Sequence, residues 1–246
     1  MSTQEVLPTA AAPVVVPTKG PPVEAAPGLL LEQVHRFSVE EYHRMGEAGV
    51  ISPQRRTELI EGIVVDMTPI SIAHRYAVDA LLEILPRMLK PDWYPSGQNP
   101  LQLSRSEPEP DVAILRGSFR DYHDRHPQPK DAGLVIEVAE TSLDYDRRTK
   151  GFLYSKHNVP EYWIVNLVED CVEVYRPGPG QAERFLPAET FGIGSEVPLA
   201  LAGRNYGSVR VADLIVVGRS ESLETEKCRI VLSSSMLLSP AITVSI

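Results

Sequence analysis

The chain has 246 residues, of which 43% are hydrophobic and 23% charged, and its formal net charge at pH 7 is −9. This length can bury a full core, and the composition is that of an ordinary globular protein, so one domain with tails is expected. The negative charge excludes a broad phosphate-binding surface, because such a surface is basic. Any contact with nucleic acid must therefore come from a local patch.

The sequence also argues against membrane and disulfide-rich proteins. No apolar run reaches the roughly 18 residues of a membrane span, and the amino end lacks the basic start and compact apolar block of a secretory signal. A cytoplasmic protein without a membrane partner is therefore expected. The two cysteines, Cys171 and Cys228, are too few for a disulfide framework or a cysteine-based zinc site. Packing is the expected role of Cys171.

Three regions are expected along the chain. Residues 1–29 are predicted to be a disordered arm, because prolines interrupt its alanines and valines and no periodicity survives. The folded domain is expected over residues 30–218. Residues 219–246 are rich in serine, show no steady period and are predicted to form a weakly ordered tail.

The folded domain is predicted to open with a short helix, a strand and a longer helix. Ser38 and Glu41 form a capping box that starts a helix towards Met45. Residues 58–67 are predicted as one strand. Residues 71–90 carry apolar side chains at helical spacing, which predicts an amphipathic helix.

The hydrophobic period then changes to that of strands. Residues 101–103 and 111–115 are predicted as paired strands joined by the acidic turn at residues 107–110. Residues 116–133 are polar and are expected to form a long surface loop. Residues 134–138 are almost continuously apolar, which is typical of a strand covered on both faces.

A helix and a hairpin are expected next. The pattern is helical from Ser142 until Val159, and residues 161–166 and 171–175 are predicted to form the hairpin. A strand, a helix and a strand in that order imply a crossover connection within one mixed sheet. The predicted architecture is therefore α/β.

Two acids and a lysine in this region indicate metal-assisted hydrolysis of a phosphodiester. Asp111 begins one predicted strand, Glu137 interrupts the apolar run, and Lys150 lies on the following helix. A carboxylate in an apolar run is costly unless something binds it. Two carboxylates can hold Mg²⁺ or Mn²⁺ against a phosphate, and a lysine can orient water or neutralise charge in the transition state.

These residues belong to a wider pattern that resembles the Uma-two family of restriction-endonuclease-like proteins, a branch of the PD-(D/E)XK nuclease superfamily. The resemblance covers roughly residues 36–217. The matching motifs are residues 36–42 (RFSVEEY), 58–62 (ELIEG), His74, 109–113 (EPDVA), 134–138 (LVIEV), Asp146 with Lys150 and Tyr154, and 159–165 (VPEYWIV). Together these motifs are specific, although each one alone would be weak.

The resemblance implies a restriction-endonuclease-like mixed sheet flanked by helices, and a set of site residues. Asp111 stands where the superfamily has its first metal-binding aspartate, and Glu137 where it has its second acid. The superfamily pattern expects a lysine two positions after that acid, but Ala139 occupies the position here. In some branches the lysine has moved to the following helix, which makes Lys150 the candidate.

An additional acid and several substrate contacts are also expected. Glu58 or Glu61 would resemble the extra acid that the superfamily contributes ahead of the central hairpin, and the sequence does not choose between them. The candidate substrate-binding residues are Arg147, Arg148, Tyr154 and His74. Arg147 and Arg148 form the only compact basic cluster near the proposed site, and Tyr154 lies on the same helical face as Lys150.

His123 and His126 could be mistaken for metal ligands. Both lie in the polar loop expected over residues 116–133. The sequence shows no third ligand at metal-site spacing, so two solvated loop histidines are expected instead.

Two functions from different classes fit the pattern. The first is a metal-dependent endonuclease acting on nucleic acid, with DNA favoured over RNA. The second is a scaffold or interaction module that keeps the nuclease fold without turnover, which the acidic charge and Ala139 favour. Because the chain has few basic residues, substrate binding is expected to be weak or to need a homodimer.

Overall fold

The computed structural model describes residues 34–89, 91–178 and 184–216. The chain divides into two units, residues 1–35 and 36–246, and the fold belongs to the second. The predicted arm over residues 1–29, the predicted tail over 219–246 and the domain boundaries at 30 and 218 lie outside the described residues.

The core of the fold is a mixed six-stranded sheet in the order β3-β4-β5-β6-β7-β8. Strands β5 and β6 are parallel and every other neighbouring pair is antiparallel. The strands are β3 (Trp93–Gly97), β4 (Val112–Arg116), β5 (Ala132–Ala139), β6 (Tyr162–Asn166), β7 (Cys171–Tyr175) and β8 (Glu189–Gly192). The predicted crossover and hairpin are thus confirmed as β5, β6 and β7, and the α/β fold class is confirmed.

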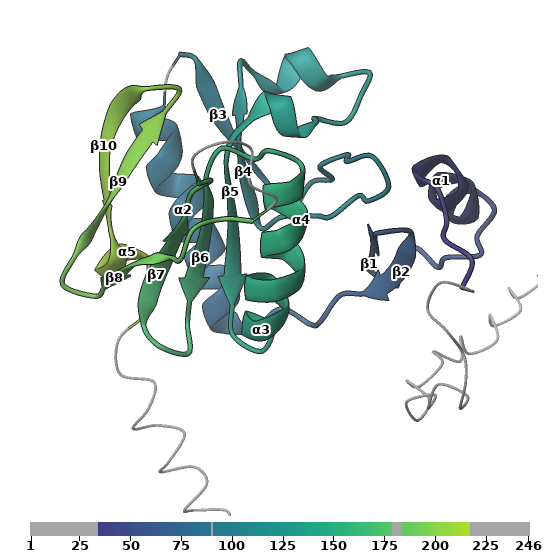
Figure 1. The fold of residues 1–246 in the computed structure, drawn as a ribbon, viewed down its shortest axis with the longest axis horizontal. Helices are drawn as coiled ribbons and strands as arrows, with labels where there is room; N and C mark the ends of the chain where they lie inside the picture. Colours follow the sequence, from purple (N-terminus) through teal and green to yellow (C-terminus); the bar gives the residue numbers. More distant parts are fainter. Residues whose placement is uncertain (1–33, 90, 179–183, 217–246) are drawn as a thin grey trace, which may run out of the picture. The chain divides into compact units, whose positions relative to one another are not determined.

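Helices cover both faces of this sheet, and the strand residues alternate between two apolar clusters (Figure 1). Ile114 and Ile136 pack in the cluster that contains the buried side of α2 (Ile72–Met88). Ala113 and Val135 pack with Leu153 on the opposite face. All eight residues of β5 are buried, as expected of a strand covered on both faces.

The second face is covered by one continuous helical segment. It consists of α3 (Leu143–Tyr145), the π-helical stretch η4 (Asp146–Lys150) and α4 (Gly151–Lys156). The prediction of a helix after Ser142 is confirmed. A π-helical turn inside an α-helix is rare and often occurs at functional sites.

The prediction of one strand over residues 58–67 is wrong, because the segment is a hairpin of β1 (Thr57–Ile60) and β2 (Ile63–Asp66). Glu61 and Gly62 turn the chain with φ of 48° and 77°. A side chain at Gly62 would place its Cβ 2.8 Å from the Cβ of Arg36, so this turn requires glycine. Both flanks of the turn are apolar, which is why they look like one run in the sequence.

The predicted pairing of residues 101–103 with 111–115 is also wrong. The strand that pairs with β4 is β3, and residues 101–103 form a loop whose backbone bonds back to residues 106–108. Pro95 lies inside β3, but β3 is at the edge of the sheet and an edge strand tolerates proline. The loop predicted over residues 116–133 runs from residue 117 to 131, since Arg116 ends β4 and Ala132 begins β5, and it contains the short turns η2 (Phe119–Tyr122) and η3 (Pro129–Asp131).

The remaining elements lie outside this sheet. The helix α1 (Val39–Glu47) begins with the predicted capping box of Ser38 and Glu41. The hairpin β9 (Glu196–Leu201) and β10 (Arg204–Arg210) and the helix α5 (Val211–Leu214), which were not predicted, pack in the same cluster as α2. None of the described helices has the length and apolar character needed to cross a membrane.

Candidate active site

The register between β4 and β5 brings the two predicted acids together. Val112 pairs with Ile136, so the next residues outward, Asp111 and Glu137, face each other across the two strands. The backbone N–H of Asp111 donates to Glu137 Oε2 at 3.3 Å, and the N–H of Val138 donates to Asp111 Oδ2 at 2.8 Å. Both carboxylates are buried and both line one cavity of about 280 Å³.

The helical segment brings Lys150 to the same place. Its Nζ lies 3.0 Å from Glu137 Oε1 and 2.9 Å from Glu58 Oε1, and the lysine is only 6% exposed. The hydroxyl of Tyr154 donates to Glu137 Oε1 at 2.7 Å. The lysine and the tyrosine therefore hold the same carboxylate oxygen.

The structure also separates Glu58 from Glu61. Glu58 lies on the buried strand β1 and contacts Lys150, whereas Glu61 lies at the hairpin turn and pairs with Lys156 at 3.2 Å. Both side chains of that second pair are about 40% exposed. Of the two candidates for the auxiliary acid, only Glu58 reaches the cluster around Glu137.

His74 lies on the other side of Asp111. It is in the first turn of α2, where the N-cap Ser71 starts the helix, and its Nε2 is 3.0 Å from Asp111 Oδ2. Its other ring nitrogen, Nδ1, is buried and has no hydrogen-bond partner among the described residues. Gln98 Nε2 approaches Asp111 Oδ1 at 3.5 Å, which is a weak contact.

Asp146 is a further member of the site. It lines the same cavity, is 3% exposed, and accepts a hydrogen bond of 2.5 Å from Ser142 Oγ. Asp146 belongs to the family motif in the sequence, but no role was predicted for it. The sequence feature that indicates its place in the site is its position four residues before Lys150, on the same helical face.

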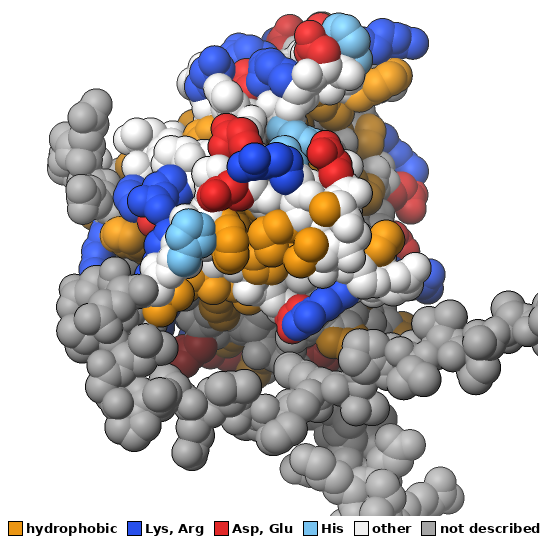
Figure 2. All heavy atoms as spheres, turned by 90° about the vertical axis from the view of Figure 1, so that its right-hand side faces the viewer, with side chains coloured by type: hydrophobic (Ala, Val, Ile, Leu, Met, Phe, Trp, Pro, Cys, Tyr) orange, Lys and Arg blue, Asp and Glu red, His pale blue; other side chains and the backbone are white. Residues whose placement is uncertain are grey.

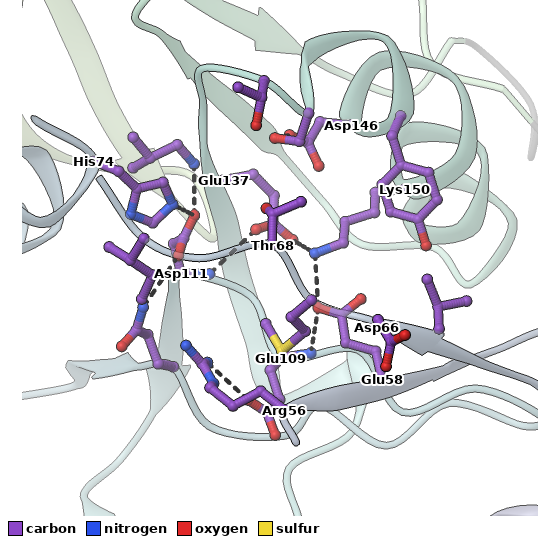
Figure 3. Close-up of a pocket in the computed structure, with 18 residues that line it drawn as sticks. Arg56, Glu58, Asp66, Thr68, His74, Glu109, Asp111, Glu137, Asp146 and Lys150 are labelled. Carbon is purple, nitrogen blue, oxygen red and sulfur yellow. Dashed lines mark hydrogen bonds and ion pairs between the residues drawn. The ribbon is translucent and has the colours of Figure 1, made fainter. Parts of the chain in front are cut away.

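The cavity is strongly acidic, and its labelled side chains converge from the sheet, the helices and the β1–β2 hairpin (Figure 3). The acids that line it are Glu58, Asp66, Glu109, Asp111, Glu137 and Asp146. The lining contains one arginine, Arg56, and one lysine, Lys150. This excess of carboxylates attracts cations and repels a bare phosphate.

The electrostatics of the cavity follow from burial. Burial raises the pKa of Glu137 to about 8; Lys150 opposes this shift, while the Asp111, Asp146 and Glu58 carboxylates add to it. Burial likewise raises the pKa of Asp146 to about 6. For Lys150 burial lowers the pKa, but the Glu137 and Glu58 carboxylates outweigh this and hold it well above its usual value. The lysine is therefore a cation among crowded acids.

The basic pair at residues 147 and 148 is not in this cavity. Arg147 donates to Glu173 Oε1 at 2.5 Å and to Glu169 Oε1 at 3.1 Å, so acids of the β6–β7 hairpin engage its guanidinium. Arg148 is exposed, 3.7 Å from Asp144. Both arginines line a separate hollow that also contains Phe152. Their predicted contact with substrate stays a prediction.

Two further groups of side chains have ligand atoms close enough for a metal ion. In the first, Glu169, Cys171 and Glu173, the guanidinium of Arg147 already balances both glutamates. The second is His43, Glu107 and His126. His126 was expected to be a solvated loop histidine, with no third ligand at metal-site spacing in the sequence. It lies in the predicted loop, but the fold brings it near His43 and Glu107, which are 83 and 19 positions away in the sequence.

Comparisons with known proteins agree with this fold. A solved structure titled as a putative nuclease belonging to DUF820 from Anabaena variabilis ATCC 29413 matches with a TM-score of 0.55 at 16% identity, over 72% of this chain and 97% of that one. A comparison with curated proteins gives no match. The model of the Uma2 (Uma-two) family, described as "Putative restriction endonuclease", matches residues 39–223. The chain belongs to the Uma2 family.

Proposed function

We propose that this protein is an endonuclease that hydrolyses phosphodiester bonds of nucleic acid with the help of Mg²⁺ or Mn²⁺, with DNA favoured over RNA. The observation that carries the proposal is the buried Glu137 carboxylate, which faces Asp111 and is held by Lys150 and Tyr154. The description of the family as restriction endonucleases supports both the reaction and DNA as the substrate.

Asp111 and Glu137 fit a hard divalent cation. They present carboxylate oxygens, which are the ligands that Mg²⁺ and Mn²⁺ prefer, from neighbouring strands. Their burial among other acids is unfavourable without a cation: burial itself is the main cause of the raised pKa of Glu137, and the neighbouring carboxylates add to it. A bound divalent cation would act as a Lewis acid towards the phosphate and lower the pKa of a bound water.

The other side chains of the cluster have separate proposed roles. Lys150 orients the attacking water or neutralises charge that develops on the phosphate, since its ammonium stays cationic and lies 3.0 Å from Glu137. Glu58 positions that ammonium from the opposite side and is the proposed auxiliary acid. Tyr154 orients the Glu137 carboxylate, and His74 orients Asp111 and is placed to contact the substrate.

Binding of the nucleic acid is proposed to be weak in the monomer. Lys and Arg side chains are interspersed with Asp and Glu on the face shown in Figure 2, and the net charge is −9. Arg147 and Arg148 would have to exchange their acidic partners for phosphates. A homodimer would double the number of phosphate contacts, which is why we propose one for the active form.

The test is cleavage of plasmid DNA, single-stranded DNA and RNA by purified protein at low salt, with Mg²⁺, with Mn²⁺ and with a chelator. Wild type should cleave DNA only with metal, and Asp111→Asn and Glu137→Gln should not cleave. Asp144→Asn is the matched control, because Asp144 is on the same helical segment but is exposed beside Arg148. Wild type without any metal-dependent cleavage would favour the scaffold function instead.

A further inference from the structure

Three side chains from distant parts of the sequence meet beside the β1–β2 hairpin. His43 comes from α1, Glu107 from the loop that precedes β4, and His126 from the loop between η2 and η3. One ligand atom from each lies within 4.8 Å of the others. None of these three described side chains lines the acidic cavity, so the group is separate from the proposed active site.

The contacts within this group leave one carboxylate oxygen unused. His43 Nε2 lies 2.7 Å from Glu107 Oε1, and the rings of His43 and His126 are 5.8 Å apart at 59°. The Glu107 side chain is only 4% exposed, and its Oε2 has no hydrogen-bond partner among the described residues. A buried carboxylate oxygen without a partner is unfavourable, and a bound water or ion is one of the usual ways in which such an atom is satisfied.

The backbone holds two of the three side chains firmly. Glu107 exchanges backbone hydrogen bonds with Leu59 of β1, at 2.7 Å and 3.4 Å. The helix α1 is fixed by its capping box and by the hydroxyl of Tyr42, which donates to the Thr57 carbonyl at 2.8 Å. The positions of His43 and Glu107 are therefore set before any ligand arrives.

The loop that carries His126 is tied down on both sides. Arg125 makes two hydrogen bonds to Asp131, at 2.6 Å and 3.2 Å. On the other side the backbone N–H of Gln102 donates to the Pro127 carbonyl at 2.9 Å. The third side chain is thus presented by a braced loop, which lowers the entropy lost when a ligand binds.

We propose that His43, Glu107 and His126 bind a divalent transition-metal ion, for which Zn²⁺ is the best fit. Two imidazoles and one carboxylate form a known zinc ligand set, whereas Mg²⁺ prefers oxygen ligands only. Metal–ligand bonds of about 2.0 to 2.2 Å in a tetrahedral site put the ligand atoms about 3.3 Å apart. The three atoms are already within 4.8 Å, so side-chain adjustments suffice.

This site has a different function from the acidic cavity. The ion would join α1, the loop before Asp111 and the loop before β5, which are otherwise linked by a few hydrogen bonds. A ligand that binds only the folded state stabilises it. Zn²⁺ should therefore raise the melting temperature without replacing Mg²⁺ or Mn²⁺ in cleavage, and the fourth coordination position is left for water.

The test uses the full-length, metal-stripped protein and Zn²⁺ or Co²⁺ alone. Calorimetry should show a Zn²⁺ equivalent that is lost in His126→Ala, and Co²⁺ should give the visible absorption of a tetrahedral site. Loss of a partner outside the ligand shell already weakens binding by about 10- to 100-fold, so loss of a ligand should weaken it by at least about tenfold. His123→Ala is the control from the same loop, where the ring contacts only the Arg120 carbonyl.

A second pair of variants separates the two sites. Asp111→Asn should keep the Zn²⁺ equivalent and its increase in melting temperature, and His43→Ala should lose both while circular dichroism shows a folded protein. Zn²⁺ binding that is equally strong in wild type, His43→Ala and His126→Ala would overturn the proposal. Absence of saturable Zn²⁺ binding to wild type would overturn it as well, and would leave His43 and Glu107 as a hydrogen-bonded pair.

Discussion

Replacing Lys150 with methionine tests whether the site is held together as the contacts indicate. The change keeps most of the side-chain volume but removes the ammonium that lies 2.9 Å from Glu58 and 3.0 Å from Glu137. Both carboxylates have only 4% of their side chains exposed, so solvent compensates only in part for the lost partner. Breaking a buried ion pair on one side costs about 3–5 kcal/mol.

For a domain of this size, each kcal/mol shifts the melting temperature by about 2–4 °C, so a decrease of about 6–20 °C is expected. Urea unfolding and calorimetry without divalent metal measure it. The matched control is Lys156→Met, because the pair of Lys156 with Glu61 is exposed and is worth at most about 1 kcal/mol. Adding Glu58→Gln to Lys150→Met should recover part of the loss by removing one unpaired carboxylate. A Lys150→Met protein as stable as the control variant would refute this reasoning.

Three other changes give distinct outcomes. Asp111→Asn should remain folded, with a melting temperature equal to or above wild type, since it removes a buried charge among acids. Glu137→Gln should also remain folded, because Glu58 still pairs with Lys150, but the lost ion pair with Lys150 offsets the relief of repulsion; unfolded variants by circular dichroism would contradict either expectation. Glu58→Gln should lower kcat in the plasmid assay and Glu61→Gln should not, because only Glu58 contacts Lys150; equal effects would argue against Glu58. Burial raises the pKa of Glu173, but hydrogen bonds led by the one from Arg147 outweigh this and hold the pKa below its usual value. The ionised Glu173 therefore stabilises the folded protein above about pH 4.5, and this contribution is lost as the pH falls through the lowered pKa. Glu173→Gln should therefore destabilise at pH 7 and progressively less on acidification, as measured by thermal unfolding; a constant difference would rule this out.

Local patterns predicted the parts of the fold that local interactions determine. The capping box at Ser38 needs only Glu41, three residues away, and the apolar run of β5 needs only its own residues. The errors arose where a turn interrupts an apolar run or where the pairing is distant. The turn at Gly62 depends on contact with Arg36, and the edge position of Pro95 depends on the order of the strands.

The candidate site shows the same division. Asp111, Glu137 and Lys150 lie within 40 residues of one another, and a strand, a crossover and a helix suffice to place them together. The choice between Glu58 and Glu61 depends on a contact between Glu58 and Lys150, which are 92 positions apart in the sequence, and could not be made locally. His43 and His126 are also far apart in the sequence, and no spacing rule for metal ligands would have predicted that they lie close together.

The position of the lysine on the helix has a physical reason. Ala139 lies on the same face of β5 as Glu137 and is fully buried in the apolar cluster that also contains Leu153 and Tyr154. A lysine at 139 would have to place its stem in that cluster, where Tyr154 already reaches Glu137. The π-helical turn instead brings Lys150 to the Glu137 Oε1 atom that Tyr154 also contacts, and Glu58 provides a second carboxylate there. An ammonium can therefore be supplied to the same carboxylate from either element, and the packing around Ala139 favours the helix here.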